Sequence, residues 1–285
     1  MHPMVIKSPA KINLALQIKG VREDGYHLLR MVNLPLELHD VIEIETLPYY
    51  NDTYVTCDEL RLLGLRSNLC TKAVDAMRAR FGFTNHFMIH IHKEIPFAAG
   101  LGGGSSNAAV VLIALNKILK LNLTTEQLCE IALPLGSDIP FFIRGFPALA
   151  EGIGDNLTRI HPKKQYFCIL VKPDAGLSTK DVYQNCDKFD RLPIDIDGVV
   201  RGLETGDDDL IAKSFGNDLY PASCHLLPEV QKVVDGLRAD GFPIAAMSGS
   251  GSCCFALTSD AKKAKAEEKK LTKNGLNVIL TKTLI

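Results

Sequence analysis

No stretch of the sequence stays apolar for long enough to cross a bilayer. The longest apolar run, residues 108–115, is far short of the roughly 20 residues that a membrane-spanning helix needs. The N-terminal residues MHPMVIKSPAK also lack the apolar core of a signal peptide. We therefore expect a cytoplasmic protein.

The sequence also lacks an excess of charge of either sign. Its 32 Lys and Arg residues and 33 Asp and Glu residues give a net charge of −1. This balance argues against binding nucleic acid or another polyanion through bulk electrostatics. The expected partner is a small molecule, with neither nucleic acid nor membrane, and the expected assembly is a monomer or a weak homodimer.

The eight cysteines form no CxxC pair and no zinc-knuckle spacing. Cys253 and Cys254 are adjacent, which is poor geometry for a disulfide and for a zinc site. Scattered cysteines in a chain without a secretory signal usually serve as small core residues. We expect no structural zinc.

With 285 residues and 46% apolar content, the chain can bury a large core or two medium ones. Alternating polar and apolar residues predict strands at residues 9–20, 40–46 and 87–93. A helix is predicted near residues 68–80, and a fully buried one starts near Ser105. A capping box from Thr124 to Gln127 begins another helix, which ends around residues 134–136.

The second half of the chain has a different order of elements: strand, several helices, two strands around a Ser/Gly turn, a charged helix and a last strand. That order suits a split βαβ, ferredoxin-like α+β unit. The polar stretch at residues 155–163 marks the boundary, which predicts domains at residues 1–158 and 159–285.

The segment PFAAGLGGGSSNAA, residues 96–109, combines four glycines and two serines before the apolar run. It lacks the lysine of a Walker A loop, and a Rossmann GxGxxG starting at Gly100 would have Ser105 at its sixth position. Glycines allow backbone N–H groups to approach an anion, and a helix N-terminus adds positive charge. Phosphate binding is therefore favoured, with a glycine hinge before a core helix as the alternative.

Three separated segments, PAKINLAL (residues 9–16), PFAAGLGGGSSNAA and MSGSGSCCF (residues 247–255), resemble the three motifs of the GHMP small-molecule kinases. The segments GVREDGYHLL (residues 20–29) and LGSDIPFF (residues 135–142) resemble one branch, whose substrate carries cytidine. The resemblance implies a two-domain α+β kinase with an N-terminal S5-domain-2-like α/β domain and a C-terminal ferredoxin-like domain. It also implies ATP as donor, with Mg²⁺ accompanying it.

The resemblance makes Asp138 the general base and Lys11 its partner, which also offsets charge on the phosphoryl oxygens. From the residues alone, Asp138 is a turn or cap aspartate and Lys11 a solvated lysine. The residues implied to bind ATP are Pro96, Phe97, Ala98, Ala99, Gly100, Leu101, Gly102, Gly103, Gly104, Ser105, Ser106, Asn107, Lys93 and Asn68. Ser105 and Ser106 could cap the helix, bond phosphate or help to hold Mg²⁺. Lys93 and Asn68 could equally be surface residues.

The resemblance places Tyr26 and His27 at the cytosine end of the substrate. The full set implied to bind the substrate is Asn13, Tyr26, His27, Thr179, Tyr183, Gly249, Ser250 and Gly251. Tyr26 and His27 could instead close a turn, and the glycines could serve only a hairpin.

Two departures from the family pattern are small: Ser137 stands where alanine is common, and Ser248 where threonine is common. His90 and His92 lie on the same side of a strand, where we favour a solvated face over a metal pair. No carboxylate is assigned to Mg²⁺. The rival functions are another GHMP kinase with a different alcohol substrate, and a non-catalytic nucleotide or sugar-phosphate sensor.

Overall fold

The computed structural model describes residues 3–23, 25–47, 52–58 and 68–285, so Asp24 of the DGYH segment lies outside the described residues. The chain forms two compact units. The first contains residues Met1–Ala10, Leu38–Ile95 and Gly102–Gly145, and the second contains Lys11–Glu37, Pro96–Leu101 and Phe146–Ile285. The predicted boundary at residues 158/159 stays a prediction.

The alternation predicted at residues 40–46 and 87–93 forms strands in the first unit, which also contains one strand that was not predicted, β3 (Tyr54–Cys57). The second half of β2 (His27–Leu47) pairs antiparallel with β4 (His86–His92), and β4 pairs parallel with β3. One face of these strands is buried through isoleucines such as Ile44 and Ile89, while the other face is polar. The alternation of side chains in a strand accounts for this two-sided pattern.

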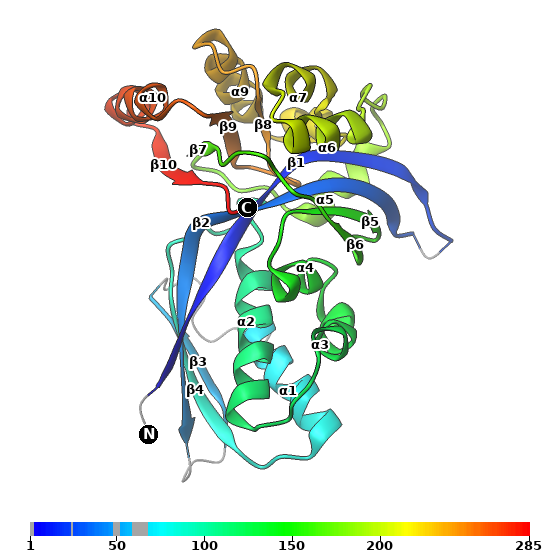
Figure 1. Ribbon diagram of the computed structural model, residues 1–285, viewed down its shortest axis with the longest axis vertical. Helices are drawn as coiled ribbons and strands as arrows, with labels where there is room; N and C mark the ends of the chain where they lie inside the picture. Colours follow the sequence, from blue (N-terminus) through cyan, green and yellow to red (C-terminus); the bar gives the residue numbers. More distant parts are fainter. Residues whose placement is uncertain (1–2, 24, 48–51, 59–67) are drawn as a thin grey trace. The chain divides into compact units, whose positions relative to one another are not determined.

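In its described residues the first unit has four α-helices: α1 (Leu69–Phe81), α2 (Gly103–Ile118), α3 (Thr125–Ala132) and α4 (Ile139–Arg144). Helix α2 contacts both α1 and α4 and is buried around most of its circumference, as predicted (Figure 1). The capping box of α3 is confirmed, with both of its hydrogen bonds present. The chain then continues through a short 3₁₀ helix, Leu133–Leu135.

The start of α2 differs from the prediction by two residues. The helix begins at Gly103 rather than near Ser105, because Gly102 takes the N-cap position with φ at 72°. This left-handed conformation costs glycine little, so the loop can turn sharply into the helix.

Among the described residues, the second unit contains parts of two sheets. Strand β1 (Met4–Val21) pairs with β2, the first half of β2 pairs antiparallel with β5 (Ala148–Gly152), and β5 pairs with β6 (Asn156–Arg159). The polar stretch predicted as a boundary therefore carries β6.

The other sheet has the order β10-β7-β9-β8, with every neighbouring pair antiparallel. Its strands are β7 (Phe167–Lys172), β8 (Ala245–Met247), β9 (Cys254–Thr258) and β10 (Asn277–Lys282), with α9 (Glu229–Ala239) and α10 (Ala261–Lys273) as the crossover helices. This order confirms the predicted ferredoxin-like unit. Between β7 and α9 lie α5 (Thr179–Cys186), α6 (Ile196–Thr205), α7 (Asp208–Ser214) and α8 (Tyr220–Leu226). Among the described residues, no helix has the length and apolar character to cross a membrane.

Candidate active site

Three of the sequence motifs meet inside the second unit. The loop Pro96–Leu101 accepts a hydrogen bond at the Leu101 carbonyl from the Lys11 N–H of β1, at 3.0 Å. The Ser248 hydroxyl, in the turn between β8 and β9, donates to the Gly100 carbonyl at 2.9 Å. The same hydroxyl accepts from the Asn13 N–H at 3.2 Å. Segments that are far apart in the sequence thus form one hydrogen-bonded cluster.

Gly100 is required where the loop crosses the Ser/Gly turn. Its φ is 73°, and a Cβ built on it would lie 2.1 Å from the Ser248 carbonyl oxygen. Ordinary Cβ contacts are never this short, so no side chain fits. The backbone at Gly100 lies directly against the backbone at Ser248. This close approach explains why one of the four glycines is needed.

Lys11 and Asn13 are buried side by side on one face of β1, with 4% and 1% of their surfaces exposed. The Lys11 ammonium donates to Asn13 Oδ1, and the Asn13 amide donates to Asn33 Oδ1 at 2.6 Å. The strand alternation predicted the shared face. The structure replaces the solvated-lysine interpretation of Lys11 with a buried, fixed ammonium.

Asn217 also belongs to this cluster, although no sequence pattern singled it out. Its amide donates to the carbonyls of Met247 and Gly249, at 3.0 and 2.8 Å, and so fixes the Ser/Gly turn. Asn217 lies in an irregular segment between two helices, where neither a motif nor a periodicity marks it.

The rest of the glycine loop, from Gly102 to Asn107, forms the start of α2 in the first unit. The first N–H groups of a helix have no acceptor within the helix, so this end can receive an anion. The buried Ser106 hydroxyl instead forms a hydrogen bond with the Ser8 hydroxyl at 2.8 Å, and Ser8 Oγ lies 2.7 Å from Asn107 Oδ1. Ser105 is half-buried and is the serine better placed to meet a ligand.

Asp138 occupies the N-cap position of α4 in the first unit. The prediction of a turn or cap position is confirmed for its backbone, but its side chain makes no capping hydrogen bond to the helix. The Asp138 carboxylate therefore does not serve as a cap for α4.

Lys93 and Asn68 have clear structural partners in the first unit. The Lys93 ammonium contacts both carboxylate oxygens of Asp40, at 2.8 and 3.1 Å, and Asp40 is fully buried. Asn68 accepts from the Cys70 N–H at 2.9 Å and caps α1. Neither is a plain surface residue. Their predicted contacts with ATP stay predictions.

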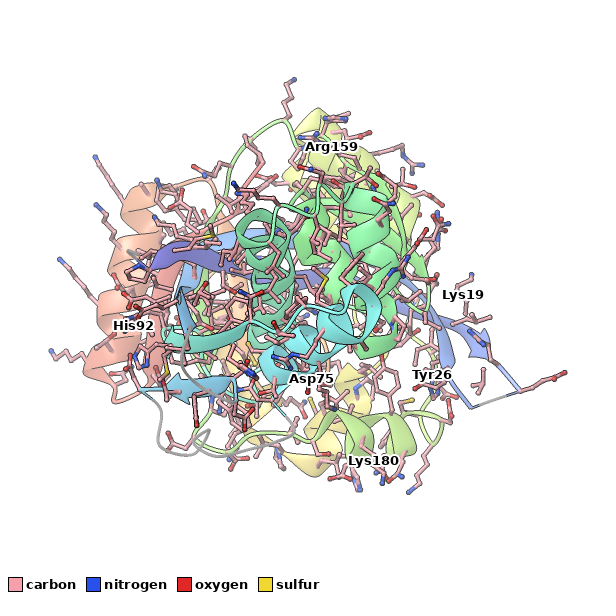
Figure 2. All side chains as sticks on the ribbon, turned by 90° about the horizontal axis from the view of Figure 1, so that it is seen from below. Lys19, Tyr26, Asp75, His92, Arg159 and Lys180 are labelled. Carbon is pink, nitrogen blue, oxygen red and sulfur yellow. The ribbon has the colours of Figure 1, made fainter. Side chains whose placement is uncertain are left out.

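The residues expected at the cytosine end also lie within the second unit. The rings of His27 and Tyr183 are 5.1 Å apart with planes inclined at 45°. Thr179 Oγ1 and Ser250 Oγ are 2.9 Å apart, which connects α5 to the Ser/Gly turn. Tyr26 is 64% exposed on the β1–β2 hairpin that also carries Lys19 (Figure 2).

Asp187 is a further polar residue beside His27, with Oδ2 at 3.2 Å from His27 Nε2. Partial desolvation raises the pKa of Asp187, but hydrogen bonds from Arg191 and His27 outweigh it and hold that pKa below its ordinary value. The carboxylate is therefore charged at neutral pH. It follows α5 directly, and no sequence pattern distinguished it from the neighbouring charged residues.

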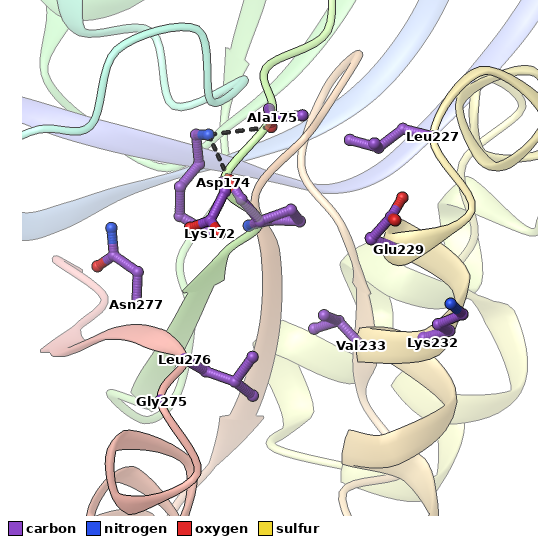
Figure 3. A pocket seen from close by; sticks show the side chains of 11 residues that line it. Lys172, Asp174, Ala175, Leu227, Glu229, Lys232, Val233, Gly275, Leu276 and Asn277 are labelled. Atoms are coloured by element: carbon purple, nitrogen blue, oxygen red, sulfur yellow. Dashed lines mark hydrogen bonds between the residues drawn. The ribbon is translucent and has the colours of Figure 1, made fainter.

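A cavity of about 370 Å³ lies elsewhere in the second unit, near the ends of β7, α9 and β10 (Figure 3). Lys172 lines it, and its ammonium donates to the carbonyls of Pro173 and Ala175 at 2.6 and 3.1 Å. None of the predicted site residues lines this cavity.

Comparison with known proteins identifies the fold. Residues 68–146 match the family model of the GHMP kinases N terminal domain, and residues 200–277 match that of the GHMP kinases C terminal. A relative from Geobacter sp. (strain M21) is 40% identical over 273 residues, covering 96% of each chain. One from Clostridium perfringens (strain 13 / Type A) is 38% identical over 260 residues, covering 90% of this chain and 89% of its own. Both are named 4-diphosphocytidyl-2-C-methyl-D-erythritol kinase.

A solved structure of 4-(cytidine 5'-diphospho)-2C-methyl-D-erythritol kinase has a TM-score of 0.80 and 28% identity, covering 98% of this chain and 99% of its own. Mevalonate kinase from Methanococcus jannaschii, at 17% identity and a TM-score of 0.71, shares the fold. The chain belongs to the GHMP kinase family and is a small-molecule kinase. Within that family, its similarity is to the 4-diphosphocytidyl-2-C-methyl-D-erythritol kinases, as the DGYH segment predicted.

Proposed function

We propose that this enzyme transfers the γ-phosphoryl group of ATP to the 2-hydroxyl of 4-diphosphocytidyl-2-C-methyl-D-erythritol, a cytidylyl methylerythritol. The products are the 2-phosphate and ADP, in the non-mevalonate (MEP) route to isoprenoid precursors. The observation that carries the proposal is the cluster of Lys11, Asn13, Gly100 and Ser248, which joins three kinase motifs in one hydrogen-bonded unit. We also propose that the enzyme is cytoplasmic and acts as a monomer or a weak homodimer.

The glycine loop holds the triphosphate in this proposal. N–H groups at the start of α2 meet the phosphates, and glycines at residues 100 and 102–104 let the backbone come close. Phosphoryl transfer depends mainly on positioning and on neutralising charge, so fixed backbone donors suit the task.

Asp138 accepts the proton of the substrate hydroxyl as the oxygen attacks phosphorus. Lys11 supplies a positive charge whose position is fixed by Asn13. A fixed ammonium in a buried site interacts strongly with negative charge that develops on the transferring phosphoryl oxygens. Lys11 therefore favours the transition state over the separated reactants.

Mg²⁺ fits the start of α2. It keeps several waters and is held largely by substrate phosphates, so it needs only one or two protein ligands. Ser105 offers one hydroxyl there, because the Ser106 hydroxyl bonds Ser8. When bound with ATP beside Ser105, Mg²⁺ would supply positive charge against the phosphates.

His27 and Tyr183 hold the cytosine in this proposal, through stacking and edge hydrogen bonds. Thr179, Ser250 and the turn at Gly249 and Gly251 contact the rest of the substrate, since the Thr179–Ser250 hydrogen bond joins these segments.

Phosphorus NMR of the reaction product tests the proposal. We expect one new phosphomonoester signal that couples to no sugar proton, because the accepting carbon at position 2 carries no hydrogen. A phosphomonoester on any other hydroxyl, or hydrolysis of ATP without a phosphorylated product, would contradict it.

A further inference from the structure

Three strands of the first unit place four polar side chains on the sheet face that is not buried by isoleucines, and Asp58 lies beside them. The register sets Glu43 of β2 and Thr56 of β3 opposite His90 of β4. His92 lies two residues further along β4 and so on the same face. Asp58 follows β3 by one residue, and its N–H donates to the Ile91 carbonyl at 3.3 Å.

Asp58 lies between the two histidine rings. Its Oδ1 is 3.0 Å from His90 Nε2, and its Oδ2 is 3.2 Å from His92 Nδ1. The three residues each offer a ligand atom, and all these atoms lie within 4.8 Å of one another. The carboxylate that follows β3 and the two imidazoles of β4 therefore converge on one point.

The second nitrogen of each ring is also engaged. Thr56 Oγ1 lies 2.7 Å from His90 Nδ1, and Glu43 Oε1 lies 3.3 Å from His92 Nε2. Histidines that bind metals almost always use their other nitrogen in this way, which fixes the tautomer and the direction of the ring. Histidines that only contact solvent would not need Thr56 and Glu43 as partners for their second ring nitrogens.

We propose that Asp58, His90 and His92 bind one divalent transition-metal ion of the Zn²⁺ class, with water in the fourth position. Zn²⁺ bonds of about 2.0–2.1 Å to nitrogen and oxygen place tetrahedral ligand atoms roughly 3.3 Å apart. The separations of 3.0 and 3.2 Å, each to a different oxygen of Asp58, are close to this value, and the three ligand atoms all lie within 4.8 Å of one another. Imidazole ligands favour such an ion over Mg²⁺, so this site is distinct from any cation that accompanies ATP.

The cluster is accessible and ready for a cation. The side chains of His90, His92 and Asp58 are 31%, 42% and 54% exposed, so an ion can enter from solvent.

Titration of the chelator-treated full chain with Zn²⁺ by calorimetry tests the proposal, with Co²⁺ absorption reporting the ligand geometry. We expect one equivalent to bind, and His90→Gln or Asp58→Asn to weaken binding at least tenfold. Glu43→Gln should weaken it by about tenfold, as loss of an outer partner does. His86→Gln, on the same face of β4, is the matched control and should bind as the parent does. Thermal unfolding without metal checks that each variant folds.

Unchanged Zn²⁺ binding in both His90→Gln and Asp58→Asn would overturn the proposal. The proposal would also be overturned if, among the variants, only Cys186→Ser lost the bound equivalent of Zn²⁺. His27, Cys186 and Asp187 form another group of possible ligands, and the ion would then bind there. Absence of binding by the parent chain would also overturn it. ATP turnover is not needed for any of these readouts, so the test is independent of the proposed kinase reaction.

Discussion

At Gly100 the surrounding backbone leaves no room for a side chain. Its positive φ disfavours any side chain, and the Ser248 carbonyl occupies the place of a Cβ. We expect Gly100→Ala to lower the free energy of unfolding by about 1–3 kcal/mol more than Gly82→Ala does, because overpacking adds to the backbone cost. Gly82 has a similar φ of 67°, and a Cβ placed on it would meet nothing within 4 Å. Denaturant unfolding measures both, and equal losses would contradict the close approach.

Asp138 carries the proposed proton transfer. Asp138→Asn keeps the size of the side chain, and the aspartate makes no capping bond to α4 that could be lost. We expect kcat to fall by about two to four orders of magnitude, the range of general-base contributions, with ATP affinity unchanged. Steady-state kinetics and equilibrium ATP binding measure the two effects, with exposed Asp174→Asn as control. Full activity of Asp138→Asn would remove this carboxylate from the mechanism.

Roles of single residues were the hardest feature to predict. The sequence indicated that Lys11 and Asn13 share a face, because alternation in a strand is a local property. It could not indicate that Ser106 bonds Ser8 or that Asn217 fixes a distant turn, since both contacts join residues far apart in the sequence. Such pairings follow from tertiary packing rather than from local pattern.

At the scale of elements, the capping box of α3 provides a direct test. Thr124 accepts from the Gln127 N–H, and the Gln127 side chain accepts from the Thr124 N–H at 2.9 Å. We expect Thr124→Ala to lower the free energy of unfolding by about 0.5–2 kcal/mol, the usual range for a lost N-cap. Thr125→Ala, one residue on and also exposed, should be close to neutral. Chemical denaturation measures the free energy of unfolding of both variants. Equal losses in the two would contradict a capping role for Thr124.

Elements with strong local signals were predicted well, and those without them were not. Strands β1 and β4 follow from alternation, and α3 follows from its cap. The start of α2 was placed two residues late, because a glycine N-cap has no side-chain signal. The short helix α4 was not predicted as a helix, since IPFF offers no helical period within six residues.

At the scale of the whole molecule, the reactivity of the cysteine thiols tests how the core is packed. All eight lie within the described residues and none forms a disulfide; six are buried, whereas Cys129 and Cys224 are partly exposed. Burial raises the pKa of Cys70 and of Cys253 to about 12, which leaves almost no reactive thiolate at pH 8. We expect at most two thiols of the native protein to react quickly with a disulfide reagent at pH 8, and all eight after unfolding. Fast reaction of more than two in the native state would contradict this packing.

The resemblance of three motifs to those of the GHMP kinases predicted the two-domain kinase fold, and the order of elements predicted its ferredoxin-like second half. The family matches and the β10-β7-β9-β8 sheet confirm both. Location, assembly and the exact domain boundary remain predictions. None of them is set by local sequence pattern, because each depends on surfaces and contacts beyond single elements.

The central claim is that a cytidine-bearing alcohol accepts phosphate from ATP. The most direct measurement is steady-state ADP release by the purified chain, comparing 4-diphosphocytidyl-2-C-methyl-D-erythritol with the same sugar alcohol lacking cytidine. We predict efficient turnover only with the cytidylyl substrate, since the His27 and Tyr183 rings have nothing to hold in the truncated one. Equal kcat/KM for both acceptors would contradict the proposed substrate, and no ADP release with either would contradict the kinase reaction itself.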